Sequence, residues 1–286
     1  MKISVFGAGS WGTALVSILS INHKINWWIR REKLATQIKN KRRNTKYLAG
    51  CKLKLINVFI TTDLDFCIKD SDFLIVAIPS EFVFNVFNSK GKLLNNKTIF
   101  SAIKGVVPEK LISPHNYFLS LNNNISYGVI SGPCHAEEIA LCKQSYLTIA
   151  SEMKTNIYQI KKTFSTSFLK ISGSDDIFGV EYAAILKNVY AIAVGIAVGL
   201  GYGDNFLSVL ITASANEMKQ ILYFLDPKER TISKSEYLGD LLVTCYSPYS
   251  RNRKLGTQIG KGFSVESALE KTPMIAEGYH SSKSII

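Results

Sequence analysis

A glycine-rich hexapeptide near the start of the chain most constrains its fold. GAGSWG at residues 7–12 follows a short apolar run, 2–6, and precedes a run that is apolar enough for a helix. Between a strand and a helix, Gly7 permits a tight turn, Gly9 lets a pyrophosphate approach the main chain, and Gly12 lets the helix pack closely on the sheet. The N–H groups at the helix start would then face the phosphates. The loop predicts a dinucleotide-binding α/β unit, and the alternative is a tight turn without a ligand.

Short β-branched runs continue to about residue 172. They lie at 2–6, 25–29, 73–78, 98–103, 126–131 and 146–150. Several are apolar at consecutive positions, which is typical of parallel strands covered on both faces. The segments between them are long enough for crossover helices. This part of the chain therefore predicts an α/β fold with a Rossmann-type, mostly parallel sheet.

The pattern changes after about residue 175. Residues 179–225 read as helix throughout, and no strand-like alternation follows them. A length of 286 residues suits two domains of ordinary size. We therefore predict a dinucleotide-binding domain over 1–175 and an all-helical substrate and catalytic domain over 176–286.

Composition limits the compartment and the partners. The longest apolar run, 189–200, is shorter than the ~20 residues that span a bilayer, and no leader is evident. Five Cys without a CxxC pair predict a reducing, cytoplasmic location and no metal site. The net charge of +12 suits anionic ligands. The basic cluster 39–43 raises nucleic acid as an alternative, but no nucleic-acid fold signature accompanies it, so we expect a small-molecule substrate.

The end of the second predicted strand bears on the choice of cofactor. NAD enzymes usually place an acidic residue there for the ribose 2′-hydroxyl. Here 25–29 runs into Arg30 and Arg31, and Glu32 comes only afterwards. Guanidiniums suit a 2′-phosphate, so we expect NADP(H) in preference to NAD(H). The alternative is a solvated pair at a strand end.

Two lysines are candidates for the chemistry. Reduction of a ketone by hydride needs a proton donor and positive charge near the developing alkoxide. Lys104 follows the predicted strand 98–103, at the edge where α/β sheets bind ligands. Lys187 interrupts the small and apolar run 183–189, where burial of an amine needs a partner or a task. From the pattern alone, a solvent-exposed position is as consistent with each of the two lysines as a position in the active site.

Polar residues in two further segments suit a phosphorylated substrate. Asp240 and Thr244 are spaced i and i+4, so they share one face if their segment is helical. SRNRK at 250–254 follows, with Arg251 and Asn252 suited to a phosphate. Cys134 and His135 are adjacent and so do not face one another as a nucleophile pair. His280 is expected at the surface.

These segments together resemble the bacterial type of NAD(P)-dependent glycerol-3-phosphate dehydrogenase. The matching stretches, in the family's order, are GAGSWGTA at 7–14, Lys104-Gly105, ISGPCHAEEIA at 130–140, VEYAAILKNVYAIAVGIAVGLGYGDN at 180–205, LGDLLVTC at 238–245, SRNRKLG at 250–256 and AEGY at 276–279. The resemblance implies reversible reduction of dihydroxyacetone phosphate to sn-glycerol 3-phosphate, which supplies glycerophospholipid synthesis. It leaves a homodimer open.

The resemblance also implies residue roles. Lys187 is the proton donor and acceptor, and Lys104 contacts both cofactor and substrate. The implied catalytic set is Lys187, Lys104, Asp240 and Thr244. The implied substrate-binding set is Lys104, Gly132, Cys134, Lys187, Asp240, Ser250, Arg251 and Asn252. With the glycine loop and Arg31, the cofactor-binding set is Gly7, Gly9, Ser10, Trp11, Gly12, Arg30, Arg31, Lys104, Ala136, Arg251, Ile275 and Glu277.

Two features depart from the family's pattern. Position 134 is Cys where the family commonly has Ser or Thr, so a thiol contact replaces a hydroxyl contact. The chain also ends at Ile286, within what reads as a helix beginning near Ala276, where bacterial relatives continue. This predicts a truncated helical domain. The alternatives are a cofactor-binding protein with lost or weak activity, or a related dehydrogenase of another hydroxy acid.

Overall fold

The computed structural model describes residues 2–272 and 275–285. An eight-stranded sheet has the order β10-β9-β8-β7-β6-β1-β2-β5, and every neighbouring pair in it is parallel except β8 with β9. The strands are β1 (Ile3–Phe6), β2 (Ile25–Trp28), β5 (Val58–Thr61), β6 (Phe73–Val76), β7 (Thr98–Ser101), β8 (Ser126–Ser131), β9 (Ser145–Ser151) and β10 (Leu169–Ser174). A hairpin of β3 (Arg43–Asn44) and β4 (Leu48–Lys52) stands apart from the sheet.

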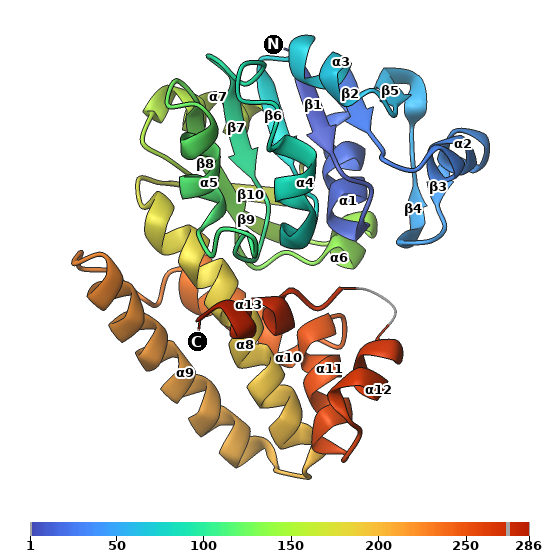
Figure 1. Ribbon diagram of the computed structural model, residues 1–286. Coiled ribbons are helices and arrows are strands. Elements are labelled where there is room, and N and C mark those ends of the chain that lie inside the picture. The colour runs from blue at the N-terminus through green and yellow to red at the C-terminus, as the bar shows by residue number, and fades with distance from the viewer. Residues whose placement is uncertain (1, 273–274, 286) are drawn as a thin grey trace.

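Helices cover both faces of this sheet (Figure 1). They are α1 (Ser10–Leu19), α2 (Glu32–Lys41), α3 (Leu64–Lys69), α4 (Val83–Phe87), α5 (Pro114–Leu121), α6 (Ala136–Ala140) and α7 (Lys154–Thr163), with short 3₁₀ turns at Leu55–Asn57 and Ser80–Phe82. In β1, Ile3 and Val5 join the core that includes α1, whereas Phe6 joins the core that includes α4 and α5. The consecutive apolar residues of the strands thus fill two cores.

The six predicted strands are present within a few residues of their expected bounds, and the mostly parallel sheet is confirmed. Strands β5 and β10 and the β3–β4 hairpin were not predicted. Both β5 and β10 are the outermost strands of the sheet, and Phe59 of β5 is 56% exposed. Strand β10 (LKISGS) lacks a continuous apolar run, so the pattern that found the inner strands missed it, whereas β5 (VFIT) is a short apolar run that was not recognised as a strand.

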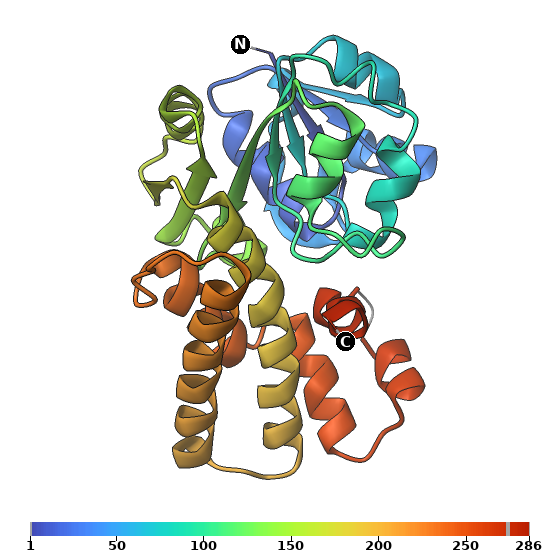
Figure 2. The same cartoon turned by 60° about the vertical axis from the view of Figure 1, so that its left-hand side comes forward.

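The C-terminal part is helical in the described residues. It contains α8 (Ile177–Gly199), α9 (Asp204–Leu225), a π-helical turn (Ser235–Gly239), α10 (Asp240–Tyr246), α11 (Arg251–Gly260), α12 (Val265–Glu270) and α13 (Glu277–Ile285). The prediction of continuous helix over 179–225 was wrong. The chain reverses over 200–203, where Gly201 has φ +89°, and α8 and α9 then run side by side (Figures 1 and 2).

Helix α8 is the central element of this part. Its 23 residues and mean hydropathy of 1.6 would suffice to cross a membrane, although the longest uninterrupted apolar run is shorter. However, 61% of its most apolar stretch is buried inside the protein, against α9, α10, α11 and α13. The apolar composition of α8 is that of a core helix. Strand β10 ends at Ser174 just before it, next to the predicted domain boundary at 175/176, which stays a prediction.

Candidate active site

Two adjoining cavities open where β1, β6, β7 and β8 end. The first, of about 160 Å³, is lined by the loops after these strands together with α8, α10 and the start of α11. The second, of about 350 Å³, lies between the glycine loop and the end of β2. Both are lined by Gly9, Ser10, Ala77, Ile78, Pro79, Arg251 and Ile275. The cavities therefore form one elongated cleft at the sheet edge where open α/β folds bind ligands.

The glycine loop has the backbone that a dinucleotide needs. Gly7 has φ +111°, and a Cβ at Gly12 would lie 2.4 Å from the Gly7 carbonyl oxygen, so Gly12 packs under the loop and lines neither cavity. A Cβ at Gly9 would meet no atom within 4 Å. Helix α1 starts beside the cleft without a side-chain cap or an acidic residue in its first turn. The N–H groups at this helix start suit a phosphate.

Trp11 supplies a second indication that this cleft takes a ligand. Its Nε1 is buried and has no hydrogen-bond partner in the described residues, although the residue lines the first cavity. A buried donor without a partner is costly. A bound dinucleotide would offer an acceptor to the Trp11 Nε1–H and would lie against the open glycine loop.

Cations line the second cavity. Arg30 and Arg31 lie on one side and Lys46 on another, and all three are exposed. The Arg30 guanidinium lies 4.5 Å from the centre of the ring of Phe82, which also lines this cavity. Ser10 donates its hydroxyl to the Tyr47 carbonyl (2.7 Å), which holds the segment carrying Lys46 against the glycine loop. This end of the cleft suits a phosphate that projects from a ribose.

A buried ion pair lies at the other end. Lys187 of α8 pairs with Asp240 of α10, and the two residues are 3% and 1% exposed. Asp240 also accepts hydrogen bonds from the Ser131 hydroxyl (3.2 Å) and the Gly132 N–H (3.3 Å). Its carboxylate is therefore held on three sides, and Gly132, which has φ +116°, supports Asp240 without lining either cavity.

The environment of Lys187 suits proton transfer near neutral pH. Burial lowers the pKa of Lys187 to about 7, with Asp240 opposing the shift and the positive charge of Lys104 adding to it. A buried amine near its pKa can both donate and accept a proton. The exposed helical position that the sequence left open for this lysine is thus excluded.

Lys104 links the two ends of the cleft. It follows β7, and its Nζ lies 5.6 Å from the centre of the Trp11 ring while its charge acts on Lys187. Its carbonyl accepts a hydrogen bond from the Asn188 side chain (3.1 Å). Lys104 therefore lies between the glycine loop and the Lys187–Asp240 pair.

The start of α11 forms the wall opposite the sheet. Ser250 caps this helix by accepting from the Arg253 N–H (3.3 Å), and Arg251 donates to the Ile275 carbonyl (3.2 Å). Asn252 accepts from the Gly278 N–H (3.0 Å) and donates to the Asn188 Oδ1 (2.8 Å). Arg251 is half-buried at the junction of the two cavities. It is the guanidinium that both cavities share.

The remaining predicted residues lie around the first cavity. Thr244 donates its hydroxyl to the Asp240 carbonyl (2.6 Å), one turn back on α10. Ala136 begins α6 at the cavity wall. Glu277 accepts from both the N–H (3.1 Å) and the hydroxyl (2.6 Å) of Ser80, so it ties α13 to the loop after β6. Burial raises the pKa of Glu277.

Cys134 and His135 are not arranged as a nucleophile and base. Burial raises the pKa of the Cys134 thiol to about 12, so the thiol is neutral. His135 lies 3.4 Å from the Val243 carbonyl through Nε2, and burial together with Lys187 and Lys104 lowers its pKa to about 4. His280, expected at the surface, is half-buried and lies 3.8 Å from Glu81.

Sequence reasoning missed several residues that line the cleft. They are Asn188, Lys46, Tyr47, His135 and Tyr249. Asn188 could have been identified from the sequence, since it is a polar residue that follows Lys187 directly within an apolar stretch of helix. Lys46 and Tyr47 reach the cleft only because the β3–β4 hairpin folds back over the glycine loop.

Comparisons with known proteins agree with this geometry. The family model for the N-terminus of NAD-dependent glycerol-3-phosphate dehydrogenase matches residues 2–157, and that for the C-terminus matches 176–286. Glycerol-3-phosphate dehydrogenase [NAD(P)+] of Bacillus licheniformis is 37% identical over 99% of this chain and 83% of its own length. The Bacillus subtilis enzyme of the same name is 33% identical over 99% and 83%.

Solved structures agree as well. Glycerol-3-phosphate dehydrogenase from Coxiella burnetii aligns with a TM-score of 0.94 and 26% identity, over 99% of this chain and 87% of that one. A UDP-D-ManNAc dehydrogenase from Pyrococcus horikoshii shares the fold alone, with a TM-score of 0.54 and 12% identity over 96% of this chain and 73% of that one. The glycine loop, the buried Lys187–Asp240 pair and these matches lead to one conclusion: the chain belongs to the NAD-dependent glycerol-3-phosphate dehydrogenase family.

Proposed function

We propose that this chain catalyses the reversible, NAD(P)H-dependent reduction of dihydroxyacetone phosphate to sn-glycerol 3-phosphate, for glycerophospholipid synthesis. The observation that carries the proposal is the buried Lys187–Asp240 pair, which faces a cleft shared by the glycine loop and Arg251. The curated relatives named above act in the same class, so neither a related hydroxy-acid dehydrogenase nor a merely cofactor-binding protein is favoured.

The nicotinamide cofactor, when bound, supplies or accepts the hydride. The glycine loop, Trp11 and the cations of the second cavity would hold it. Lys187, as an ammonium, donates a proton to the oxygen of the reduced carbonyl, and as a free amine it takes that proton back in the oxidation. Asp240 holds the Lys187 Nζ in place, and Lys104 stabilises the negative charge that develops on the same oxygen.

Arg251 and Asn252 are proposed to bind the substrate phosphate. Arg251 lines the same cavity as Lys104, and its guanidinium has further N–H donors beyond the one given to Ile275. The second N–H of the Asn252 amide is available beside it. Phosphate binding away from the reacting carbon would orient the ketone toward Lys187.

We further propose NADP(H) as the preferred cofactor, because Arg30, Arg31 and Lys46 surround the second cavity without an acidic residue among its lining side chains. A cytoplasmic location and the boundary near residue 175 belong to the same proposal, while a homodimer stays open. The five cysteines are free thiols, as a reducing compartment requires.

The direct test measures NADPH consumption by the purified chain with dihydroxyacetone phosphate. Unphosphorylated dihydroxyacetone is the matched control for the phosphate, and NADH is the control for the cofactor. We expect turnover that requires the phosphate and is faster with NADPH. Equal rates with both ketones would remove the phosphate-binding role of Arg251 and with it the proposed substrate.

A further inference from the structure

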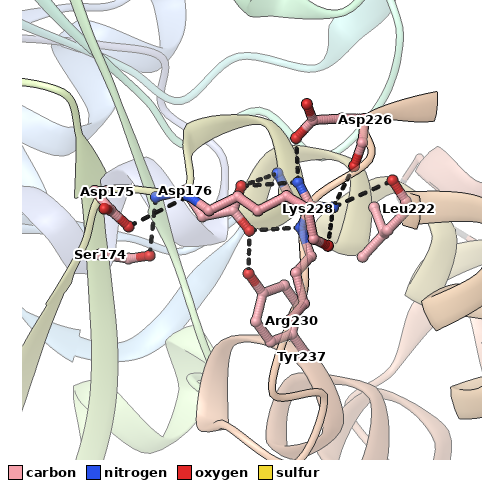
Figure 3. A network of polar contacts seen from close by, with 9 residues as sticks. Ser174, Asp175, Asp176, Leu222, Asp226, Lys228, Arg230 and Tyr237 are labelled. Carbon is pink, nitrogen blue, oxygen red and sulfur yellow. Dashed lines mark hydrogen bonds and ion pairs between the residues drawn. The ribbon is translucent and has the colours of Figure 1, made fainter. Parts of the chain in front are cut away.

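A second buried polar network lies outside the cleft, where α8 begins (Figure 3). Arg230 follows α9 and donates to both oxygens of Asp176, through Nε (2.7 Å) and Nη2 (3.0 Å). The same guanidinium pairs with Asp226 and donates to the carbonyls of Leu222 (3.2 Å) and Asp226 (2.8 Å), which closes the end of α9. Arg230 is 8% exposed and Asp176 is 7% exposed, so these two residues form an interior ion pair, whereas the Asp226 side chain is 42% exposed.

Asp176 serves a second element in this network. Its Oδ1 accepts from the Gly179 N–H (3.0 Å) and so caps the first turn of α8. A Cβ on Gly179 would lie 2.1 Å from the Asp176 carboxylate, so the turn and the network are in close contact. Burial alone would raise the pKa of Asp176, but the bonds from Arg230, Tyr237 and Gly179 lower it below its usual range. The carboxylate is thus charged and fixed at the start of the helix that carries Lys187.

Tyr237 connects this carboxylate to the other member of the catalytic pair. Its hydroxyl donates to the Asp176 Oδ2 (2.5 Å), and its ring is 3% exposed. Its main-chain carbonyl accepts from the Asp240 N–H, which the Ser235 carbonyl also accepts, across the π-helical turn that precedes α10. One residue therefore touches Asp176 with its side chain and Asp240 with its backbone.

These contacts close a ring. It runs from Lys187 to Asp240, to Tyr237, to Asp176, and back to Lys187 along about three turns of α8. Because a helix is stiff over about three turns, the position of Tyr237 relative to Asp176 sets the position of Asp240 relative to Lys187. We propose that Tyr237, through Asp176 and Arg230, is a positioning residue that holds the Asp240 carboxylate against the Lys187 amine.

This inference rests on the proposed function only where it predicts a change in kcat. The predicted change in the Lys187–Asp240 pair does not depend on that function. Loss of the Tyr237 hydroxyl would loosen the Lys187–Asp240 pair. Since Asp240 raises the pKa of Lys187, a looser pair would lower that pKa. The other titratable groups that act on Lys187 are Lys104, His135, Cys134 and Cys245, and they stay unchanged.

The test compares Tyr237→Phe with Tyr190→Phe. Tyr190 is also buried, lies on α8, and donates its hydroxyl to a carboxylate, that of Glu217 (3.2 Å), but it is not part of the ring. Each variant loses one tyrosine hydroxyl that donates to a carboxylate. Because the Tyr190–Glu217 bond is only partly buried and Glu217 is exposed, Tyr190→Phe should lose less stability than Tyr237→Phe. In Tyr237→Phe we expect kcat to fall on the order of tenfold with KM unchanged, because the proton donor is misplaced and the phosphate site is not.

A measurement without turnover separates the two proposals. NMR of lysine labelled with ¹³C and ¹⁵N follows the Lys187 titration, and the signal is assigned by its absence in Lys187→Ala. We expect the midpoint to fall by about 0.5 on the pH scale in Tyr237→Phe and to stay in place in Tyr190→Phe. Equal midpoints in the two variants overturn the positioning role even in a fully active enzyme. Absence of turnover in the unmutated chain overturns the proposed function and leaves the NMR result decisive for the ring.

Asp176→Asn provides a second variant should Tyr237→Phe not fold. Asn still caps α8 through its side-chain oxygen but loses the charge that faces Arg230. It should shift the Lys187 midpoint in the same direction as Tyr237→Phe. A midpoint equal to that of the unmutated chain would again contradict the ring.

Discussion

The two ends of the cleft are built in opposite ways. At the dinucleotide end, one local segment supplies the glycine turn and the start of α1, and the cations around it are exposed. At the end proposed to be catalytic, Lys187, Asp240 and Lys104 come from segments far apart in the chain, and the Lys187–Asp240 pair is almost fully buried. Burial lowers the pKa of Lys187, whereas the exposed arginines stay in contact with solvent. Recognition of a charged ligand works from the surface, but tuning of a proton donor needs an interior.

The substitution Lys187→Ala should have the largest effect, because it removes the buried amine that distinguishes the two ends of the cleft. Loss of the proton donor should lower turnover by roughly 10²- to 10⁴-fold. Asp240 would also lose its cation in the interior, so the free energy of unfolding should fall by about 3 kcal/mol. NADPH affinity, measured by fluorescence titration, should stay close to that of the unmutated chain because the glycine loop is untouched. Near-normal turnover would show that another group donates the proton.

Arg251→Ala tests the junction of the two ends. A charge-assisted hydrogen bond is worth about 1.5–3 kcal/mol, so the KM for dihydroxyacetone phosphate should rise roughly 10- to 100-fold. Steady-state kinetics with both ketones provides the measurement, and the low rate with unphosphorylated dihydroxyacetone should not change. A fall that is equal for both ketones would place Arg251 at the reacting carbon and not at the phosphate.

The pH dependence tests the interior environment itself. Reduction needs Lys187 as an ammonium, so kcat should fall as the pH rises through about 7, by up to about tenfold per pH unit. Oxidation needs the free amine, so its kcat should rise over the same range. We expect kcat for reduction and kcat for oxidation to change in opposite directions with pH, around the same midpoint. A midpoint near 10 in both directions would mean that Lys187 titrates as an exposed lysine.

Arg30→Ala should have the smallest effect. Arg30 is exposed, and a surface charge contact contributes at most about 1 kcal/mol, so the KM for NADPH should rise about fivefold while that for NADH stays unchanged. The free energy of unfolding should move by no more than about 0.5 kcal/mol. Lys33→Ala is the matched control, an exposed cation of α2 that does not line the cavity. An equal loss with NADH would mean that Arg30 contacts a part common to both cofactors.

Local pattern was sufficient for much of the fold. The glycine loop, the inner strands and the helical C-terminal part were predicted because each is encoded in a few consecutive residues. The turn at 200–203 was missed, although Gly201 and Gly203 lie in it, because the apolar residues of α8 and α9 on either side were read as one helix. Strand β10 was missed because it carries no continuous apolar run, whereas β5 is a short apolar run that was not recognised as a strand.

The sequence by itself determined the residue types of the site. It supplied a loop without side chains for a pyrophosphate, two arginines after a strand, and a lysine within an apolar helix. Only the tertiary structure decided that Lys187 is buried, that Asp240 is its partner, and that Tyr237 joins Asp176 to Asp240. The reason is physical: a pKa depends on the solvent and charges around a group, and those neighbours come from parts of the chain that only folding brings together.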